Sequence, residues 1–449
     1  HAPGSASHLQ DVYEKVRFQD MKIMNRIKIS KNRVVACFAA ILLLLPVTAG
    51  AQHFDAHVAG RKVTLQECFD LAARQNLQMQ AGKKSVERAQ VMQGTAWELD
   101  KTEVSFSQNP ATGGESDNGF TFTQSLDFPT VYASRRNQLK AETQAEKSRL
   151  NVVNQQLKAE IANTYYQMLY QSHRLQILQR IDSVLDRYSK IAEMRYKAGE
   201  SRQLEYLSAD RKCNENRLEM ADVKSEIERL QIDLMSQLNT QEPVKPAEEN
   251  LSAIAAQNLN TYNYQQSADG IYRQDKLIAL DKEIKAAKTG FAPSLSLSLR
   301  TQCVISSWNP YNIDRSRFAE GNFFGFEIGV GIPLFYGSTK AKVKAAQKDR
   351  ELAEIEMRQE QTEKERDYRL CTKRLQAASN RLKYYEQNNQ AHSAQISKLS
   401  AIEYENGEIS YVEYVNAIEE TIDVLMKHAD AINEYNQAVI AIQRLTGMM

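Results

Sequence analysis

Two long stretches without glycine or proline constrain this chain more than any other feature. They cover residues 130–198 and 338–406, and they are equal in length. Glycine and proline are the residues that most often end a helix, and only 18 and 9 of them occur among the 449 residues. Each stretch therefore predicts one very long helix, roughly 100 Å from end to end at 1.5 Å per residue.

The apolar residues inside the first stretch have the spacing of a packed helix. They recur mostly at steps of three and four between Gln, Lys, Glu and Asn, which predicts a narrow coiled-coil-like stripe. Gly199 and Gly407 then interrupt the pattern, as helix C-caps do, and it resumes over 200–240 and 408–446. Two long helical hairpins are expected. The residues of the first stripe are Leu150, Val153, Leu157, Ile161, Tyr165, Leu169, Leu175, Leu178, Ile181 and Leu185.

The two halves of the chain repeat one another. Phe120–Tyr132 precedes the first long stretch and Phe324–Tyr336 precedes the second, with a proline at the same place in each. Arg195–Ala209 and Glu403–Ala417 match in the same way at the hairpin tips. A duplicated chain is therefore expected. Its parts are a first repeat at 64–240 with a helical hairpin at 130–240, a linker at 241–270, and a second repeat at 271–449 with a helical hairpin at 338–446.

Segments of period two stand before both long stretches. Phe324, Phe326, Ile328 and Val330 share one face of an extended segment, and the residues between them are Gly or Glu. Phe120 and Phe122 alternate with polar residues in the same way. Loops rich in Asn, Gly, Asp and Ser complete two β-hairpins, expected at about 101–128 and about 293–335. Four strands of about 10 residues result, the length of a strand that crosses an outer membrane.

Four such strands cannot close a barrel by themselves. About eight strands are needed even for a barrel whose interior is filled by side chains, and open edges are not tolerated in lipid. Three chains would give twelve strands and a lumen, whereas two chains would give eight and a plugged pore. The alternative is that the strands pack one face on a soluble core.

The first 51 residues are expected to lie outside the fold. An apolar block at 34–47 follows several Lys and Arg residues and precedes Ala49-Gly50-Ala51. This order is typical of a secretory signal peptide, here assigned to residues 21–51. Residues 1–20 precede the first methionines and form an upstream segment that is not part of the fold.

No catalytic or metal-binding pattern is present in the sequence. Lys and Arg number 57 against 56 Asp and Glu, so the net charge of +1 gives no attraction to nucleic acid. The cysteines after the leader have no C-x-x-C spacing, and no nucleophile elbow, P-loop or dinucleotide fingerprint occurs. We therefore expect no enzyme activity, cofactor or metal. A charged fraction of 25% excludes a bundle of membrane-spanning helices.

Taken together, these motifs resemble the TolC family of outer membrane efflux channels, with the metal-exporting CusC-like branch as one possibility. The resemblance covers about residues 64–449. It rests on Thr64–Cys68 at a helix start with Asn76-Leu77 at its end, and on the paired strand-proline-helix junctions at Pro129 and Pro333. It rests also on the Y-x-x-G…A tips at Tyr196-Gly199-Ala209 and Tyr404-Gly407-Ala417.

The resemblance implies a mainly α fold with a small β part. Three chains would form a trimeric 12-stranded barrel in the outer membrane, continuing into an α-helical tunnel in the periplasm. The homotrimer would be a passive export conduit that docks on a periplasmic membrane-fusion adaptor, itself joined to an inner-membrane pump, expected to be of the RND type. Strand residues Phe120, Phe122, Phe324, Phe326, Ile328 and Val330 would face lipid. The tip residues expected to contact the adaptor are Arg195, Tyr196, Gly199, Ala209, Tyr404, Gly407 and Ala417.

An entrance gate is expected at Val412–Ala417. Members of the family carry two acids in this stretch, and here Glu413 keeps the first while Asn416 replaces the second. Three symmetry-related copies of Glu413 would crowd like charges, which would raise their pKa values and attract cations. The alternative to a channel is a soluble periplasmic coiled-coil adaptor or structural rod. The exported substrate, whether drug, metal ion or protein, cannot be deduced from the sequence.

Overall fold

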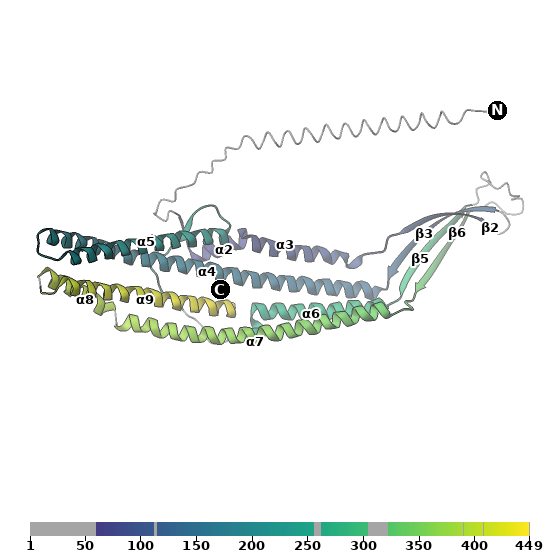
Figure 1. Cartoon of the computed structure of the whole chain (residues 1–449). Coiled ribbons are helices and arrows are strands. Elements are labelled where there is room, and N and C mark those ends of the chain that lie inside the picture. Colours follow the sequence, from purple (N-terminus) through teal and green to yellow (C-terminus); the bar gives the residue numbers. More distant parts are fainter. Residues whose placement is uncertain are drawn as a thin grey trace, which may run out of the picture. The chain divides into compact units, whose positions relative to one another are not determined.

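The computed structural model describes residues 60–111, 115–255, 262–303, 322–388, 390–406 and 408–448. The expected upstream segment at 1–20, the signal peptide at 21–51, Gly407 and most of the second strand-connecting loop lie outside the described residues. The expected mainly helical fold is confirmed, and the four expected strands are present among the six that the described residues form. Figure 1 shows those four beside one another.

The long helices form two hairpins, one in each repeat. In the first, α4 (Pro129–Lys197) is a single helix of 69 residues, and α5 (Gln203–Leu238) returns beside it. In the second, α7 (Gly337–Asn388) and α8 (Gln390–Glu405) lead to the tip, and α9 (Tyr411–Thr446) returns. Pro129 at the first position of α4 needs no hydrogen-bond acceptor there, so it starts the helix without cost.

Shorter helices lie beside the long helices, and α3 (Leu77–Met92) and α6 (Ala268–Lys288) are on the side of the strands (Figure 1). Helix α2 (Leu65–Gln75) begins with a capping box between Thr64 and Glu67, and the Asn76 side chain caps α3. Helix α6 begins within the range expected for the linker, because the Ser267 hydroxyl accepts the Gly270 N–H and caps it there. Three short 3-10 helices complete this part, η1 (Gln93–Trp97), η2 (Tyr264–Gln266) and η3 (Thr289–Phe291).

The main core lies where the two repeats meet. Ile161 and Tyr165 of α4 and Leu234 of α5, from the first repeat, are almost fully buried in one cluster with Ala429 and Ile432 of α9, from the second. Part of the expected α4 stripe therefore forms this core, and burial of each large side chain contributes about 1.5–3 kcal/mol. Among the described helices, none has a stretch sufficiently long and apolar to serve as a membrane span.

A two-stranded parallel ladder ties the linker to the start of the fold. Strand β1 (Arg61–Val63) pairs with β4 (Val244–Pro246). The Tyr165 hydroxyl donates to the Val63 carbonyl oxygen at 2.9 Å and accepts the Ala247 N–H at 3.2 Å. One buried side chain of α4 therefore bonds to β1 and to the residue that directly follows β4.

The four longer strands form one antiparallel sheet. They are β2 (Glu103–Ala111), β3 (Glu115–Asp127), β5 (Ser294–Cys303) and β6 (Asn322–Gly331), in the order β2-β3-β5-β6. The hairpins of the two repeats join through β3 and β5, with Phe122 opposite Leu299. Strands β2 and β6 are left at the two edges.

Candidate functional site: the two-faced sheet and the helix tips

One face of the sheet is apolar across all four strands. Directly paired residues share a face, and the register places Val104 beside Phe122, Phe122 beside Leu299, and Leu299 beside Phe326. Phe324 and Phe326 are both 69% exposed in the single chain. A row of large exposed apolar side chains of this extent marks a surface that is covered in the working protein. The strand residues expected to face lipid all lie on this face, namely Phe120, Phe122, Phe324, Phe326, Ile328 and Val330.

The opposite face of the sheet is small and polar. Ser294 and Ser296 lie against Gly331 and Gly329, where an added Cβ would come within 2.4 Å of a serine hydroxyl oxygen. The hydroxyls of Thr123 and Ser298 are 3.0 Å apart on neighbouring strands. The two faces therefore suit different surroundings, one apolar and one aqueous.

The first helix tip turns at Gly199. Its φ of 75° is in the left-handed region that favours glycine. The Glu200 N–H donates to the Arg195 carbonyl oxygen at 2.9 Å, and the Gly199 N–H donates to Tyr196 at 3.0 Å, which is a Schellman-type helix end. At the second tip, the Glu408 N–H donates to the Glu403 carbonyl oxygen at 2.8 Å. The duplicated sequence therefore produces matching hydrogen bonds at both tips.

A tyrosine cluster joins the two tips within one chain. Tyr188 of α4 lies 4.4 Å from Tyr414 and 5.6 Å from Tyr404 between ring centroids. Arg195 donates to the Tyr404 hydroxyl at 3.1 Å, and its guanidinium lies 5.9 Å from the centre of that ring. Burial raises the pKa of Tyr404, so its hydroxyl stays protonated at neutral pH. Hydrogen bonding and cation–π attraction thus both connect the repeats here.

The other predicted tip residues differ in exposure. Tyr196 is 39% exposed and stacks on Tyr206, with 6.1 Å between ring centroids. Ala209 is only 2% exposed, because it belongs to the same buried cluster as Tyr188, Ala192 and Tyr414. Its side chain therefore fills the interior of the tip and does not face outward. Ala417 is partly buried on α9.

Glu413, the predicted gate residue, forms a helix cap in the single chain. Its carboxylate accepts the Ser410 N–H at 2.8 Å, and the Ser410 hydroxyl accepts the Glu413 N–H at 3.4 Å. The backbone hydrogen bond from Ser410, followed by the bond to its side chain, lowers the pKa of Glu413. The expected rise through crowding of like charges is therefore opposed within each chain. Asn416 is exposed one turn further along α9.

The cap makes the start of α9 sensitive to acid. Because the folded pKa of Glu413 lies below its unfolded value, the cap stabilises the helix above that unfolded value, and the stabilisation is lost as pH falls through the folded pKa. We expect the hydrogen-exchange protection of residues 411–414 to be constant above about pH 4.5, the ordinary pKa of a glutamate, and to fall progressively as the pH is lowered below it. In the Glu413→Gln variant this pH dependence should be absent. Arg202 supplies no side-chain cap at the start of α5, which is the internal control, and equal pH dependence there would contradict the assignment.

No metal or nucleophilic site emerges in the described part of the chain. Among the residues placed by the structure, no group of three His, Cys, Asp or Glu side chains is arranged to hold a metal ion. Cys68 and Cys213 are buried, and burial raises the pKa of Cys68 to about 12, so its thiol is protonated. The Arg195–Tyr404 contact was missed by sequence analysis. The only signal for it was the concentration of tyrosines near both tips.

Comparisons with known proteins agree with this geometry. The sequence profile of the outer membrane efflux protein family matches residues 70–240 and 275–448. No curated protein sequence matches the chain. Three similar solved structures are those of CusC, of the outer-membrane channel OprN, and of the open state of the MtrE outer membrane channel of Neisseria gonorrhoeae.

These structures share the fold at low sequence identity. CusC is 15% identical with a TM-score of 0.69, and the match covers 86% of this chain and 92% of CusC. OprN is 17% identical with a TM-score of 0.67, covering 85% and 89%. MtrE is 14% identical with a TM-score of 0.67, covering 85% and 88%. With a family profile that matches most of its length and the same fold as these channels, this chain belongs to the outer membrane efflux protein family.

Proposed function

We propose that three copies of this chain form a passive export channel in the outer membrane, joined through a periplasmic adaptor to an inner-membrane pump. The observation that carries the proposal is the two-faced sheet with two open edges. An apolar outer face suits lipid, and a face of Ser, Thr and Gly suits a water-filled lumen.

The edges of the sheet support closure between copies. Strands β2 and β6 run in opposite directions, because three successive antiparallel pairings separate them. The β2 edge of one copy can therefore pair with the β6 edge of the next and continue the antiparallel order. Three copies give twelve strands, enough to enclose a lumen, and no open edge remains in lipid.

The tips are the part of the chain best suited to a partner. Exposed apolar side chains stand beside both turns, including Met194 at 61%, Leu204 at 73% and Val412 at 64% exposure. An adaptor with apolar helical ends would cover them. Arg195, Tyr196, Gly199, Tyr404, Gly407 and Ala417 remain the proposed contact region. Ala209 would act there by shaping the tip, and Glu413 and Asn416 remain the proposed entrance residues.

Electrophoresis of the outer membrane fraction tests the assembly. We expect an unheated sample to run near three times the chain mass and a boiled sample to run as the monomer, because a closed barrel resists detergent without heat. Crosslinking before boiling should preserve the trimer. A periplasmic monomer or dimer, absent from the membrane fraction, would contradict the channel and favour a soluble coiled-coil rod.

A further inference from the structure

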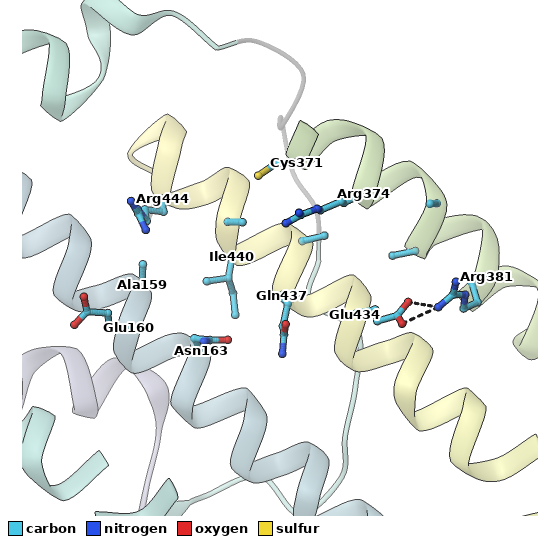
Figure 2. A pocket seen from close by; sticks show the side chains of 14 residues that line it. Ala159, Glu160, Asn163, Cys371, Arg374, Arg381, Glu434, Gln437, Ile440 and Arg444 are labelled. Carbon is cyan, nitrogen blue, oxygen red and sulfur yellow. Dashed lines mark hydrogen bonds and ion pairs between the residues drawn. The ribbon is translucent and has the colours of Figure 1, made fainter. Parts of the chain in front are cut away.

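A groove lined by arginines lies between helices α4, α7 and α9 at the level of the linker (Figure 2). Its volume is about 540 Å³, within the range of small-molecule sites. Arg374 of α7 and Arg444 of α9 line it, together with small apolar side chains such as Ala378 and Ala438. The groove therefore combines positive charge with an apolar wall.

Arg374 and Arg444, two of the three arginines that line the groove, form no ion pair with an acidic side chain among the described residues. Arg381 is neutralised, because it donates to both carboxylate oxygens of Glu434, at 2.7 Å to Oε1 (Figure 2). No ion pair to Arg374 or Arg444 is found among the residues that the structure places. Glu160 on the α4 wall accepts from Gln156 at 2.9 Å. Asp367 adjoins the same two arginines but is paired with Arg366 at 2.8 Å. Glu160 is then the one groove-lining carboxylate left against the two guanidinium groups, so the net charge of the groove is positive.

The groove and the linker meet different faces of α9, although Ile254 of the linker packs close to Ile440 at the groove's edge. Asn436 of α9 is fully buried, and it accepts the Ile254 N–H at 2.8 Å and donates to the Ser252 carbonyl oxygen at 2.9 Å. The groove is lined by other residues of α9, among them Ala441, about 140° around the helix from Asn436, and Arg444, about 80° from it. Three linkers inside a tunnel would obstruct it, so the linker belongs outside and the groove inside.

We propose that this groove is a transit site for organic anions, in which Arg374 and Arg444 attract a carboxylate, sulfonate or phosphate group while the alanine-lined wall receives the apolar part. The inference rests on the proposed trimer, where three copies would place six arginines around the lumen. Charges of one sign in a channel raise the local concentration of the opposite ion and speed its entry. The proposal concerns the tunnel at the linker level and is separate from any acidic ring at the tips.

Cys371 provides a built-in reporter of the local charge. It is partly exposed and lines the same groove between Arg374 and Arg444. Burial raises the pKa of its thiol, and the charges of the two arginines oppose that rise. Cys68 and Cys213 are buried, and the reaction of a Cys371→Ser variant supplies the background from all other thiols.

The test compares thiol reagents of opposite charge on the membrane-embedded trimer. The reaction rate of Cys371 is measured with a sulfonate-bearing and a trimethylammonium-bearing methanethiosulfonate. The ratio of the two rates cancels any change in thiol pKa. We expect the double variant Arg374→Gln/Arg444→Gln to lower the anionic-to-cationic ratio at least about tenfold at low salt, and less at 1 M salt.

A second measurement tests binding itself. Anilinonaphthalene sulfonate, an amphiphilic organic anion, should slow the reaction of Cys371 with the neutral reagent N-ethylmaleimide in the unmodified protein but not in the double variant. Lys373→Gln is the control for a general loss of charge, because it removes one positive charge, against two in the double variant, from an exposed neighbouring residue that does not line the groove. It should change neither result.

The outcomes separate this inference from the channel itself. If no trimer is found, the proposed function fails. If the trimer is intact but the rate ratio of the double variant matches the unmodified protein, the transit site is wrong. An unreactive Cys371 would equally show that the groove is closed, and an absence of protection by the organic anion would show that it binds none.

Discussion

Phe326→Asp is expected to abolish the outer membrane trimer. Phe326 is 69% exposed on the apolar face of β6, where the proposed channel meets lipid. The substitution removes an apolar transfer energy of about 1.5–3 kcal/mol and adds the cost of placing a carboxylate in the membrane. The loss occurs three times in each trimer. Heated and unheated electrophoresis of the outer membrane fraction measures it, and the trimer band should disappear.

Gly325→Asp is the matched control for this experiment. Residue 325 precedes Phe326 and lies on the opposite face, directly across from Arg300 of β5. A Cβ added there meets no atom within 4 Å. The same charge should therefore be accepted in an aqueous lumen beside a guanidinium, and trimer yield should stay near normal. Normal assembly of the Phe326→Asp variant, or loss of both variants, would show that the two faces do not have these surroundings.

Ala209→Arg is expected to open the helix tip while leaving the oligomer intact. Ala209 is 2% exposed inside the tyrosine cluster, so a long charged side chain cannot fit without displacing Tyr188 or Tyr414. Overpacking costs about 1–3 kcal/mol, and about 1.4 kcal/mol corresponds to a tenfold change in population. Cleavage at the tip by a glutamate-specific protease should therefore accelerate at least about tenfold, while the unheated trimer band persists.

Asn214→Arg is the control for the tip. Asn214 is exposed on the same helix and donates to Asp210 at 3.2 Å, so an arginine there keeps a favourable partner. Neither substitution creates a new site for the chosen protease. Only Ala209→Arg should expose the tip, and equal protection of the two variants would mean that the tyrosine cluster does not hold it closed.

Much of the fold could be predicted from local sequence signals. The absence of Gly and Pro specifies the length of α4, and the left-handed backbone at Gly199 explains why the helix ends there. Period-two alternation by itself predicts the apolar face of β6, and the register of the sheet agrees with it. These features depend on neighbours a few residues apart, so a single sequence contains them.

The surroundings of the tip residues Ala209 and Glu413 were not predicted from the sequence. Ala209 was expected to contact a partner because of its place in a repeated motif, and in the single chain it is buried in one cluster with Ala192, which its sequence position did not indicate. Glu413 was expected to be an entrance residue, and within one chain Ser410 three residues earlier also makes it the second half of a capping box. That pattern was present in the sequence as Ser-x-x-Glu, and it could have been recognised.

The sequence by itself determined the length of the helices, the position of the turns, the duplication and the two chemical faces of the strands, because all of these follow from residue type and spacing along the chain. Only the tertiary structure decided that β3 pairs with β5, that Arg195 meets Tyr404, and that Arg374 and Arg444 share a groove. Those contacts join residues that are distant in sequence. They depend on how the two repeats pack against each other, and no periodicity within either repeat specifies that packing.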